Sequence, residues 1–355
     1  MSCLEYFERP EVVELVSSKL APGLELRLFQ TFLLGSGGNP FETLDRENDL
    51  LAAAKEGHLG AVEWLYYCMK GDPKKGDARV FARICSEAAS GGRLEILRWA
   101  RDNGCPFDKD TCTYAARGGH LDCLKWARWN GCPWDERTCS HAAYIGQPEC
   151  LKWARDNGCP LSETTCAYAA EGGSLECLKW AHENGCPLND GKDTCTKAAS
   201  GGSVECLKWA RENGGDWDKW TCVYAAFCGR LECLKWAREN GCDWDAHTCA
   251  YAAFSGHLEC LRWARANGCP WDKDTCTYAA RGGRLDCLMW ARDNGCPLDE
   301  DTCAIAAEWG HLDCLKWARD NGCHWDERTC SLAAANGHPD ILQWARDNGC
   351  PEQNP

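Results

Sequence analysis

Residues 111–137 read TCTYAARGGHLDCLKWARWNGCPWDER, and this stretch returns along the chain with few changes. A Trp-Ala dipeptide marks each copy. Successive copies are 27 residues apart, except for one step of 29 residues between Trp180 and Trp209. A unit copied at a fixed period is typical of a repeat architecture. The tryptophans of this column are Trp99, Trp126, Trp153, Trp180, Trp209, Trp236, Trp263, Trp290, Trp317 and Trp344.

Each repeat has the pattern of two short helices separated by glycines. A threonine hydroxyl can accept from the free amides of a first helical turn, so Thr111 is expected as an N-cap and residues 112–117 as the first helix. Gly118 and Gly119 then end this helix, because glycine adopts the left-handed conformation without a steric penalty. Residues 121–129 are expected to form an amphipathic second helix.

A single repeat cannot hide its own apolar side chains. Its 27 residues are well below the roughly 40 residues at which a domain folds unaided. Stacked repeats bury one another's Cys, Leu, Ala and Trp side chains instead, so the Trp column is expected in the core rather than in a ligand cage. A degenerate copy at residues 50–67 precedes the regular ones. The sequence therefore predicts an all-α solenoid of about eleven helix-turn-helix repeats over residues 48–350, with a tail at 351–355.

The repeat resembles a known family. TCTYAARGGHLDCLKWARWNGCP is similar to the ankyrin unit TPLHxAAxxGHxEVVxLLLxxGADVN, with Cys112 at the family's proline and Gly131-Cys132 at its Gly-Ala. A family unit has about 33 residues, and the missing residues fall where ankyrin repeats carry a β-hairpin finger. The resemblance covers residues 50–350. It implies an ankyrin-like solenoid with shortened fingers, as in F-box/ankyrin-type repeat proteins of viruses and protists.

Charge and hydropathy exclude several classes of partner. The chain has 355 residues and a formal charge of −14, with 53 acidic and 39 basic side chains spread along it. Nucleic acid is therefore not expected as a partner. The opening lacks a signal-peptide pattern, and no apolar stretch approaches the length that crosses a bilayer, so no membrane partner is expected. We expect a monomer in the cytoplasm, with the nucleus as an alternative.

Most of the thirty cysteines fall in three columns of the repeat. One column follows Gly (Cys105), one follows Thr (Cys112), and one lies in the second helix (Cys123). Their spacing lacks the close CxxC pairs of zinc sites, and an intracellular protein keeps its thiols reduced. We interpret all three columns as core packing, because a reduced cysteine behaves as a small hydrophobic side chain. A metal-binding or redox-responsive protein remains an alternative.

No catalytic motif is found. Cys139 and His141 are the nearest approach to a nucleophile and its base, but His141 occupies a position that holds tyrosine in other repeats, such as Tyr114. No phosphate-binding loop or HExxH sequence is present. We therefore predict a protein that is not an enzyme, with no catalytic residue, no metal ligand and no cofactor.

The two positions after Ala-Ala vary between repeats, so the fold does not specify them. In the ankyrin family they lie toward the concave binding face, and the resemblance implies the same here. Exposed aromatic side chains are typical interface anchors. The alternative is that these side chains cover the ends of neighbouring helices. The candidate partner-binding residues are Arg117, Tyr144, Ile145, Glu171, Phe227, Phe254, Arg281, Glu308 and Trp309.

Residues 1–47 do not carry the repeat. Within them, residues 9–34 have the spacing of two amphipathic helices broken at residues 21–23. One interpretation is a cap that shields the first repeat, and the other is a divergent F-box. The main hypothesis is thus a scaffold that binds a partner protein through the concave face. Its rival is a substrate-recognition adapter of an SCF-type ubiquitin ligase, in which this segment binds an Skp1-type partner.

Overall fold

A computed structural model describes residues 46–70, 78–189 and 194–351 of the chain. Over these ranges the chain forms 22 α-helices in eleven consecutive pairs, with no strand. This confirms the all-α solenoid with shortened fingers. The segment interpreted as a cap or an F-box, residues 9–34, lies outside the described residues. The first described helix begins at Arg46.

Each repeat contributes one first helix and one second helix. The first helices are α4 (Arg46–Glu56), α6 (Ala78–Ser90), α8 (Lys109–Arg117), α10 (Glu136–Ile145), α12 (Thr165–Glu171), α14 (Thr194–Gly201), α16 (Lys219–Phe227), α18 (Ala246–Ser255), α20 (Lys273–Arg281), α22 (Glu300–Glu308) and α24 (Glu327–Ala335). The second helices are α5 (Leu59–Lys70), α7 (Leu94–Asp102), α9 (Leu121–Trp129), α11 (Pro148–Asp156), α13 (Leu175–Glu183), α15 (Val204–Glu212), α17 (Leu231–Glu239), α19 (Leu258–Ala266), α21 (Leu285–Asp293), α23 (Leu312–Asp320) and α25 (Pro339–Asp347).

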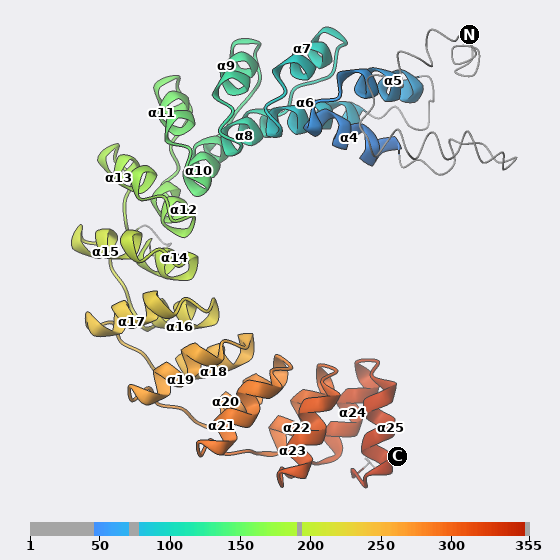
Figure 1. Ribbon diagram of the computed structural model, residues 1–355, viewed down its shortest axis with the longest axis vertical. Coiled ribbons are helices and arrows are strands. Elements are labelled where there is room, and N and C mark those ends of the chain that lie inside the picture. Colours follow the sequence, from blue (N-terminus) through green and yellow to red (C-terminus); the bar gives the residue numbers. More distant parts are fainter. Residues whose placement is uncertain (1–45, 71–77, 190–193, 352–355) are drawn as a thin grey trace, which may run out of the picture. The chain divides into compact units, whose positions relative to one another are not determined.

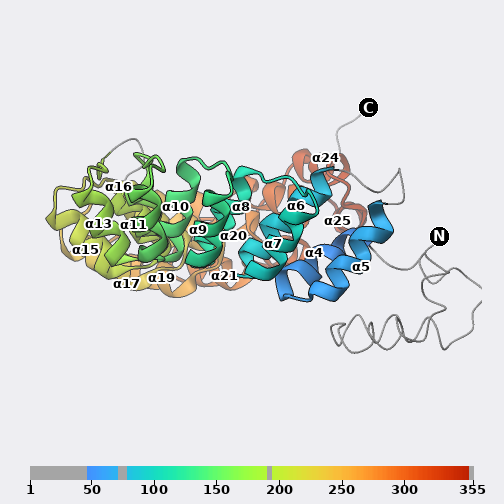
Figure 2. The ribbon, with the colours of Figure 1, turned by 90° about the horizontal axis from the view of Figure 1, so that it is seen from above.

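The chain divides into two compact bodies, an N-terminal body up to Thr165 and a C-terminal body from Cys166. Within each body, first helices pack along first helices of the next repeat, whereas second helices of successive repeats touch only lightly. Figure 2 shows the helix pairs of the N-terminal body standing side by side. Within the C-terminal body, α14, α16, α18 and α20 line the inner side of the curve and their second helices line the outer side (Figure 1). The closer packing of the first helices accounts for this curvature.

The first helix begins earlier than the sequence suggested. Thr111 is not its N-cap: the cap is Asp108, whose side chain accepts from the Thr111 amide at 3.0 Å, and α8 starts at Lys109. A carboxylate three residues before the threonine satisfies the free amide, which leaves Thr111 to be buried in the stack. The equivalent caps in other repeats are Asp135, Asp218, Asp245, Asp272, Asp299 and Asp326.

The second helix agrees with the prediction, since α9 spans Leu121–Trp129. Of the two glycines that precede it, only Gly119 has a left-handed backbone, with φ +73°. Gly118 serves a different purpose: a Cβ there would lie 2.9 Å from the Ser90 carbonyl oxygen of the preceding repeat. One glycine therefore permits the turn, and the other permits close packing between repeats.

The core consists of small side chains and leucines. Cys123, Leu124 and Ala127 of α9 are buried, and the same positions are buried in every later repeat except the last, where Leu342 is half-buried. Of the 28 described cysteines, all but Cys228 are buried, and none forms a disulfide. The prediction that the cysteine columns pack in the core is confirmed.

The Trp column does not lie in the core. All ten of its tryptophans are partly exposed. Most of them pack edge-to-face on an aromatic ring from the turn before the adjacent first helix, as Trp153 does on Trp134 at 5.9 Å. An arginine covers that second ring, with Arg128 lying 4.3 Å from the centre of Trp134. Cysteine and alanine fill the narrow space between helices, so the larger indoles line the edge of the stack.

Each repeat is also held together by a recurring polar contact. The thiol of Cys132, in the turn after α9, donates to the carbonyl oxygen of Asp108 at the start of α8, at 3.2 Å. The same bond joins Cys296 to Asp272 and Cys323 to Asp299. The aspartate thus caps the first helix with its side chain and holds the turn after the second helix with its backbone.

Candidate functional site

Aromatic side chains gather on the first helices α16, α18 and α20 of the C-terminal body. We call this surface the aromatic patch. It consists of Trp220, Tyr224, Phe227, His247, Tyr251, Phe254 and Tyr278, which are linked by ring contacts.

The rings of the patch form one continuous surface across three repeats. Phe227 and Phe254, at equivalent positions of α16 and α18, stack with centroids 6.2 Å apart and planes 11° apart. Tyr251 contacts Tyr278 of α20 edge-to-face at 5.4 Å. Aromatic pairs prefer these offset and perpendicular arrangements, so the rings hold one another in place.

The patch remains open to solvent although its rings touch. Trp220 is 37% exposed and Tyr224 is 45% exposed, while Phe227 and Phe254 are partly buried. The two phenylalanines therefore fit both earlier interpretations, because they cover a neighbouring helix and also contribute to an exposed surface. A contiguous aromatic surface of this kind is typical of an interaction site.

The helices beneath the patch are firmly held. In α16 the buried side chains Thr221, Cys222 and Ala225 face the stack, on the side opposite the exposed rings. The Lys219 ammonium forms an ion pair with Asp245, the N-cap of α18, at 2.7 Å. Burial raises the pKa of Asp245, but hydrogen bonds from Lys219 and His247 outweigh it and hold that pKa below its usual range. The patch is thus preorganised on rigid elements.

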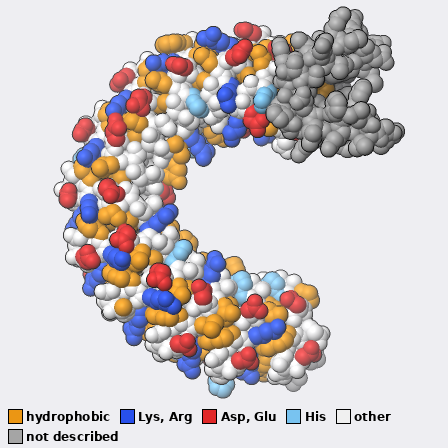
Figure 3. All heavy atoms as spheres, in the orientation of Figure 1, with side chains coloured by type: hydrophobic (Ala, Val, Ile, Leu, Met, Phe, Trp, Pro, Cys, Tyr) orange, Lys and Arg blue, Asp and Glu red, His pale blue; other side chains and the backbone are white. Residues whose placement is uncertain are grey.

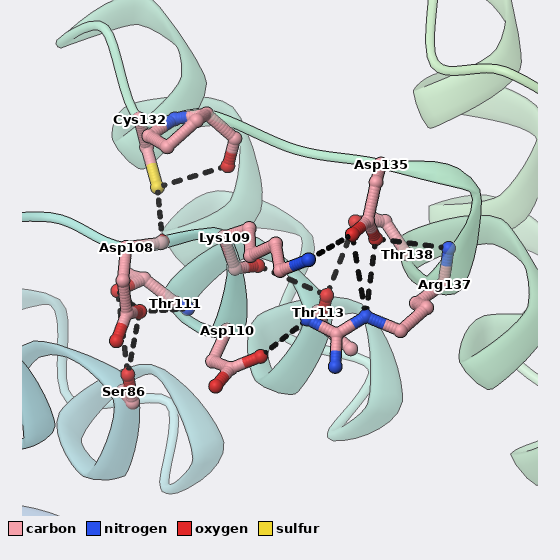
Figure 4. A network of polar contacts seen from close by, with 11 residues as sticks. Ser86, Asp108, Lys109, Asp110, Thr111, Thr113, Cys132, Asp135, Arg137 and Thr138 are labelled. Carbon is pink, nitrogen blue, oxygen red and sulfur yellow. Dashed lines mark hydrogen bonds and ion pairs between the residues drawn. The ribbon is translucent and has the colours of Figure 1, made fainter.

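The N-terminal body has the same junction with different surface chemistry. Figure 4 shows Asp135, the N-cap of α10, accepting from Lys109 of the preceding repeat at 3.0 Å. Arg137 bridges Asp135 and Asp110, and lies 2.6 Å from the latter. Ion pairs therefore lie at the start of α8 and α10. In the C-terminal body, the start of α16 has the indole of Trp220 in addition to its ion pair.

The candidate residues of the N-terminal body are exposed at the ends of first helices. Tyr144 and Ile145 end α10 and are 40% and 42% exposed, and Arg117 ends α8 and is also exposed. These three residues make a smaller surface than the aromatic patch.

The remaining candidates lie in the C-terminal body. Phe227 and Phe254 are members of the patch. The Arg281 guanidinium lies 4.7 Å from the ring centre of Trp309, so these two candidates are also brought together. Glu171 forms an ion pair with Lys197 at 3.0 Å, and Glu308 is half-buried. These two carboxylates are therefore not part of the patch.

Sequence reasoning missed most of the patch. Trp220, Tyr224, Tyr251, Tyr278 and His247 were not candidates, because only the positions after Ala-Ala were compared. Tyr224 and Tyr251 each precede a candidate phenylalanine by three residues, and residues three apart share a helix face. Reading one turn back from Phe227 and Phe254 would have found them.

The pair considered as a nucleophile and base does not have that arrangement. Cys139 is fully buried. His141 is half-buried, and burial together with Arg117 and Arg137 lowers its pKa. Among the residues that the structure describes, no group of three or more Cys, His, Asp or Glu side chains is arranged to hold a metal ion, and no helix could span a membrane.

Charges of both signs are interspersed over the surface that Figure 3 presents, with apolar side chains between them. Residues 166–248 match a family model of ankyrin repeats in three copies, and residues 303–346 match a model of ankyrin repeats in many copies. The chain therefore contains ankyrin repeats. Ankyrin repeats generally mediate interactions between proteins and are typically not enzymes.

Among solved structures, the crystal structure of the human ASB11 ankyrin repeat domain is 20% identical to this ankyrin-repeat chain, with a TM-score of 0.42. The match covers 52% of this chain and 98% of that one. No curated protein matches the chain.

Proposed function

We propose that this ankyrin-repeat protein is an interaction scaffold that binds a partner protein through its first-helix face. The aromatic patch is the observation that carries the proposal. It joins three repeats and exposes Trp220 and Tyr224, and the helices that carry it, α16, α18 and α20, line the inner side of the curve in Figure 1. Aromatic side chains dominate the binding energy of protein interfaces, because they bury a large area at little cost in conformational entropy.

The patch has the composition of an interface centre. Its tryptophan and tyrosines combine apolar rings with hydrogen-bonding groups, and Lys219 and Arg281 lie beside Trp220 and Tyr278. An apolar centre with a charged rim is the usual anatomy of a specific interface. In this proposal Arg117, Tyr144 and Ile145 supply further contacts from the N-terminal body, and Arg281 and Trp309 extend the patch.

The experiment compares partner capture by two double variants of the full chain. The test variant is Trp220→Ala with Tyr224→Ala, which removes the exposed tryptophan and the exposed tyrosine of the patch. The control variant is Trp129→Ala with Lys125→Ala on α9, where Trp129 is 72% exposed. Proximity labelling in the native cell, quantified by mass spectrometry against wild type, identifies the proteins whose capture changes.

We expect a defined set of proteins to be lost with the test variant and retained with the control. Each removed anchor should cost about 2 kcal/mol of binding free energy, or about 30-fold in Kd. Circular dichroism must show the wild-type helix content in both variants. If the α9 variant loses the partners and the patch variant keeps them, the outer helical surface is the binding site and this proposal is wrong.

A further inference from the structure

Side-chain hydroxyls join the first helices of successive repeats. The Thr113 hydroxyl oxygen lies 3.4 Å from that of Thr138 in the next repeat, and the same contact between Thr196 and Thr221 measures 2.9 Å. We call these contacts hydroxyl bridges. A bridge supplies a partner to groups that the stack removes from water. The other bridges are Ser86–Thr111, Ser140–Thr165 and Thr277–Thr302.

A bridge is missing where the residue that would supply it is apolar. Among the residues that the structure describes, four of these threonine hydroxyls are buried and have no hydrogen-bond partner. In each case the preceding repeat has alanine or valine at the bridging position: Ala167 before Thr194, Val223 before Thr248, Ala250 before Thr275 and Ala304 before Thr329. A buried hydroxyl without a partner destabilises the packed state. These four junctions therefore depend more on other contacts.

A second recurring contact joins the turn before a second helix to the preceding repeat. Arg230, the residue before α17, donates to the Ser200 carbonyl oxygen near the end of α14, at 3.1 Å. His311 lies at the same distance, 3.1 Å, from the Arg281 carbonyl oxygen. We call this contact the staple, and it satisfies a carbonyl group that has no partner within its own helix. Arg93, His120, Arg284 and His338 form the same contact.

Neither contact is found among the described residues of the junction between α12 and α14. Thr194 is one of the four threonines without a bridge, because Ala167 occupies the other position. Ser203 occupies the staple position, and its hydroxyl accepts from the Cys206 amide of its own helix at 3.2 Å. The next junction, between α14 and α16, has both a bridge and a staple. Two adjacent junctions of one body thus differ in how they are held.

The serine also leaves space that a staple fills elsewhere. A Cβ added to Gly173 would find its nearest neighbour, the Ser203 side chain, at 3.5 Å. A Cβ added to Gly229 would come within 2.6 Å of the His257 ring. The junction between α12 and α14 is therefore less closely packed at this point than one with a histidine.

An exposed ion pair joins the two helices instead. The Lys197 ammonium of α14 lies 3.0 Å from the Glu171 carboxylate at the end of α12, and the two side chains are 36% and 28% exposed. Salt screens a pair that is open to solvent. Toward the second helices, the Asn189 side chain donates to the Gly214 carbonyl oxygen at 3.0 Å and accepts from the Asp216 amide at 2.8 Å. These two bonds hold that edge without a pair of charges.

We propose that the junction between α12 and α14 is a hinge of the C-terminal body, with the Glu171–Lys197 ion pair as its latch. The Asn189 bonds form the pivot, and the first-helix edge opens when the ion pair breaks. Opening separates the α12–α13 pair from the repeats that carry the aromatic patch. Ionic strength therefore controls how often this part of the stack opens. The hinge acts in the free protein and needs no partner.

Buried cysteines can report the opening, because each first helix has one at the same position. Reduced full-length protein is labelled with N-ethylmaleimide, and mass spectrometry follows Cys166 and Cys195 at the hinge and Cys276 and Cys303 at a bridged and stapled junction, all fully buried. The hinge cysteines should label about threefold faster in high salt than in low salt, as expected for the loss of an exposed ion pair. The other two should change little.

Variants separate the latch from the missing contacts. Lys197→Gln keeps the aliphatic stem and removes the charge, so it should speed labelling of the hinge cysteines about threefold in low salt and abolish the effect of salt. Lys235→Gln removes an exposed ion pair within α17 and is the matched control, which should change neither. Ala167→Thr with Ser203→Arg supplies a bridge and a staple, and should slow labelling of the hinge cysteines about tenfold.

Two results would overturn the proposal. The first is a change with Lys197→Gln no larger than with Lys235→Gln, because the ion pair would then not be a latch. The second is unchanged labelling when the bridge and the staple are supplied, because their absence would then not set the rate of opening. Circular dichroism checks the fold of that variant. If it does not fold, Ser203→Arg alone, at a partly exposed position, provides the same comparison.

Discussion

The first helices of the two bodies have the same residue types at their buried positions and different ones at their exposed positions. In α8 and α10, Arg117 is exposed, Arg137 is partly exposed, and ion pairs join neighbouring repeats. In α16 and α18, the equivalent faces hold the stacked rings of the aromatic patch. The buried Thr, Cys and Ala positions are the same in all four helices. The repeat therefore fixes the stack and leaves the exposed positions free to determine which partner binds.

The largest expected effect tests the shared interior. Leu124→Ala in α9 and Leu234→Ala in α17 each remove a fully buried side chain. Each should cost about 3 kcal/mol of local stability, because a cavity remains in a closely packed stack. Native-state hydrogen exchange should show loosening confined to the altered repeat and its neighbours. A much larger loss in one body than in the other would mean that the two interiors are not equivalent.

The second prediction tests the difference at the surface. Phe227→Ala with Phe254→Ala removes the stacked rings of the patch and should weaken partner binding by at least about 30-fold. Tyr144→Ala with Ile145→Ala removes the smaller N-terminal surface and should weaken it by less than about fivefold. Titration calorimetry with a partner identified by proximity labelling compares the two. Equal losses would show that both bodies bind with similar energy, and the patch would lose its special status.

The third prediction concerns the capping aspartates, which occur in both bodies, and it tests them by lowering the pH. Burial raises the pKa of Asp135, but hydrogen bonds from Lys109 and Arg137 outweigh it, so the pKa is lowered, as it is for Asp245. A carboxylate with a lowered folded-state pKa adds stability above its unfolded pKa of about 4. That stability is lost as the pH falls through the folded-state pKa.

Asp135→Asn and Asp245→Asn keep an oxygen for the cap and remove the charge. Each variant should lose about 1 kcal/mol at neutral pH and show a weaker decline in stability below about pH 4. Thermal melts between pH 7 and pH 3 measure this. If the variants decline with acid as steeply as wild type, other carboxylates cause the acid sensitivity.

The smallest effect is expected at the exposed ion pairs. Arg137 and Asp110 approach to 2.6 Å in the N-terminal body, and Arg328 and Asp301 approach to 2.7 Å in the C-terminal body. Asp110→Asn and Asp301→Asn should each cost about 0.5 kcal/mol at low salt and less at 1 M salt, because exposed pairs are well screened. Urea unfolding at the two salt concentrations gives the comparison. A loss that salt does not reduce would indicate a role beyond the ion pair.

The sequence predicted the bounds of the helices better than it predicted which side chains are exposed. The bounds of α9 follow from the apolar spacing and the flanking glycines, which are local signals. The start of α8 was wrong because Thr111 and Asp108 are both good caps, and the choice depends on which of them the stack buries. The Trp column was misplaced for a related reason. Periodicity shows that Trp126 shares a face with Cys123, three residues before it, but the space between helices decides which of the two side chains is enclosed.

The aromatic patch could be predicted only in part. Phe227 and Phe254 differ from other repeats at a position that the fold leaves free, and comparison of repeats within the chain found them. Trp220 and Tyr251 touch across a repeat boundary, so their contact depends on the spacing and rotation between repeats. That geometry depends on how the helices of successive repeats pack, and the sequence of a single repeat does not determine it.

The bond from the Cys132 thiol to the Asp108 carbonyl also bears on how such a chain can be lengthened or shortened. The bond lies within one helix pair, because Asp108 caps α8 and Cys132 follows α9. The next pair has the same bond between Cys159 and Asp135. Each repeat therefore keeps this bond whichever repeats flank it, so deletion or duplication of a whole 27-residue segment by recombination within the gene would leave it in every surviving repeat.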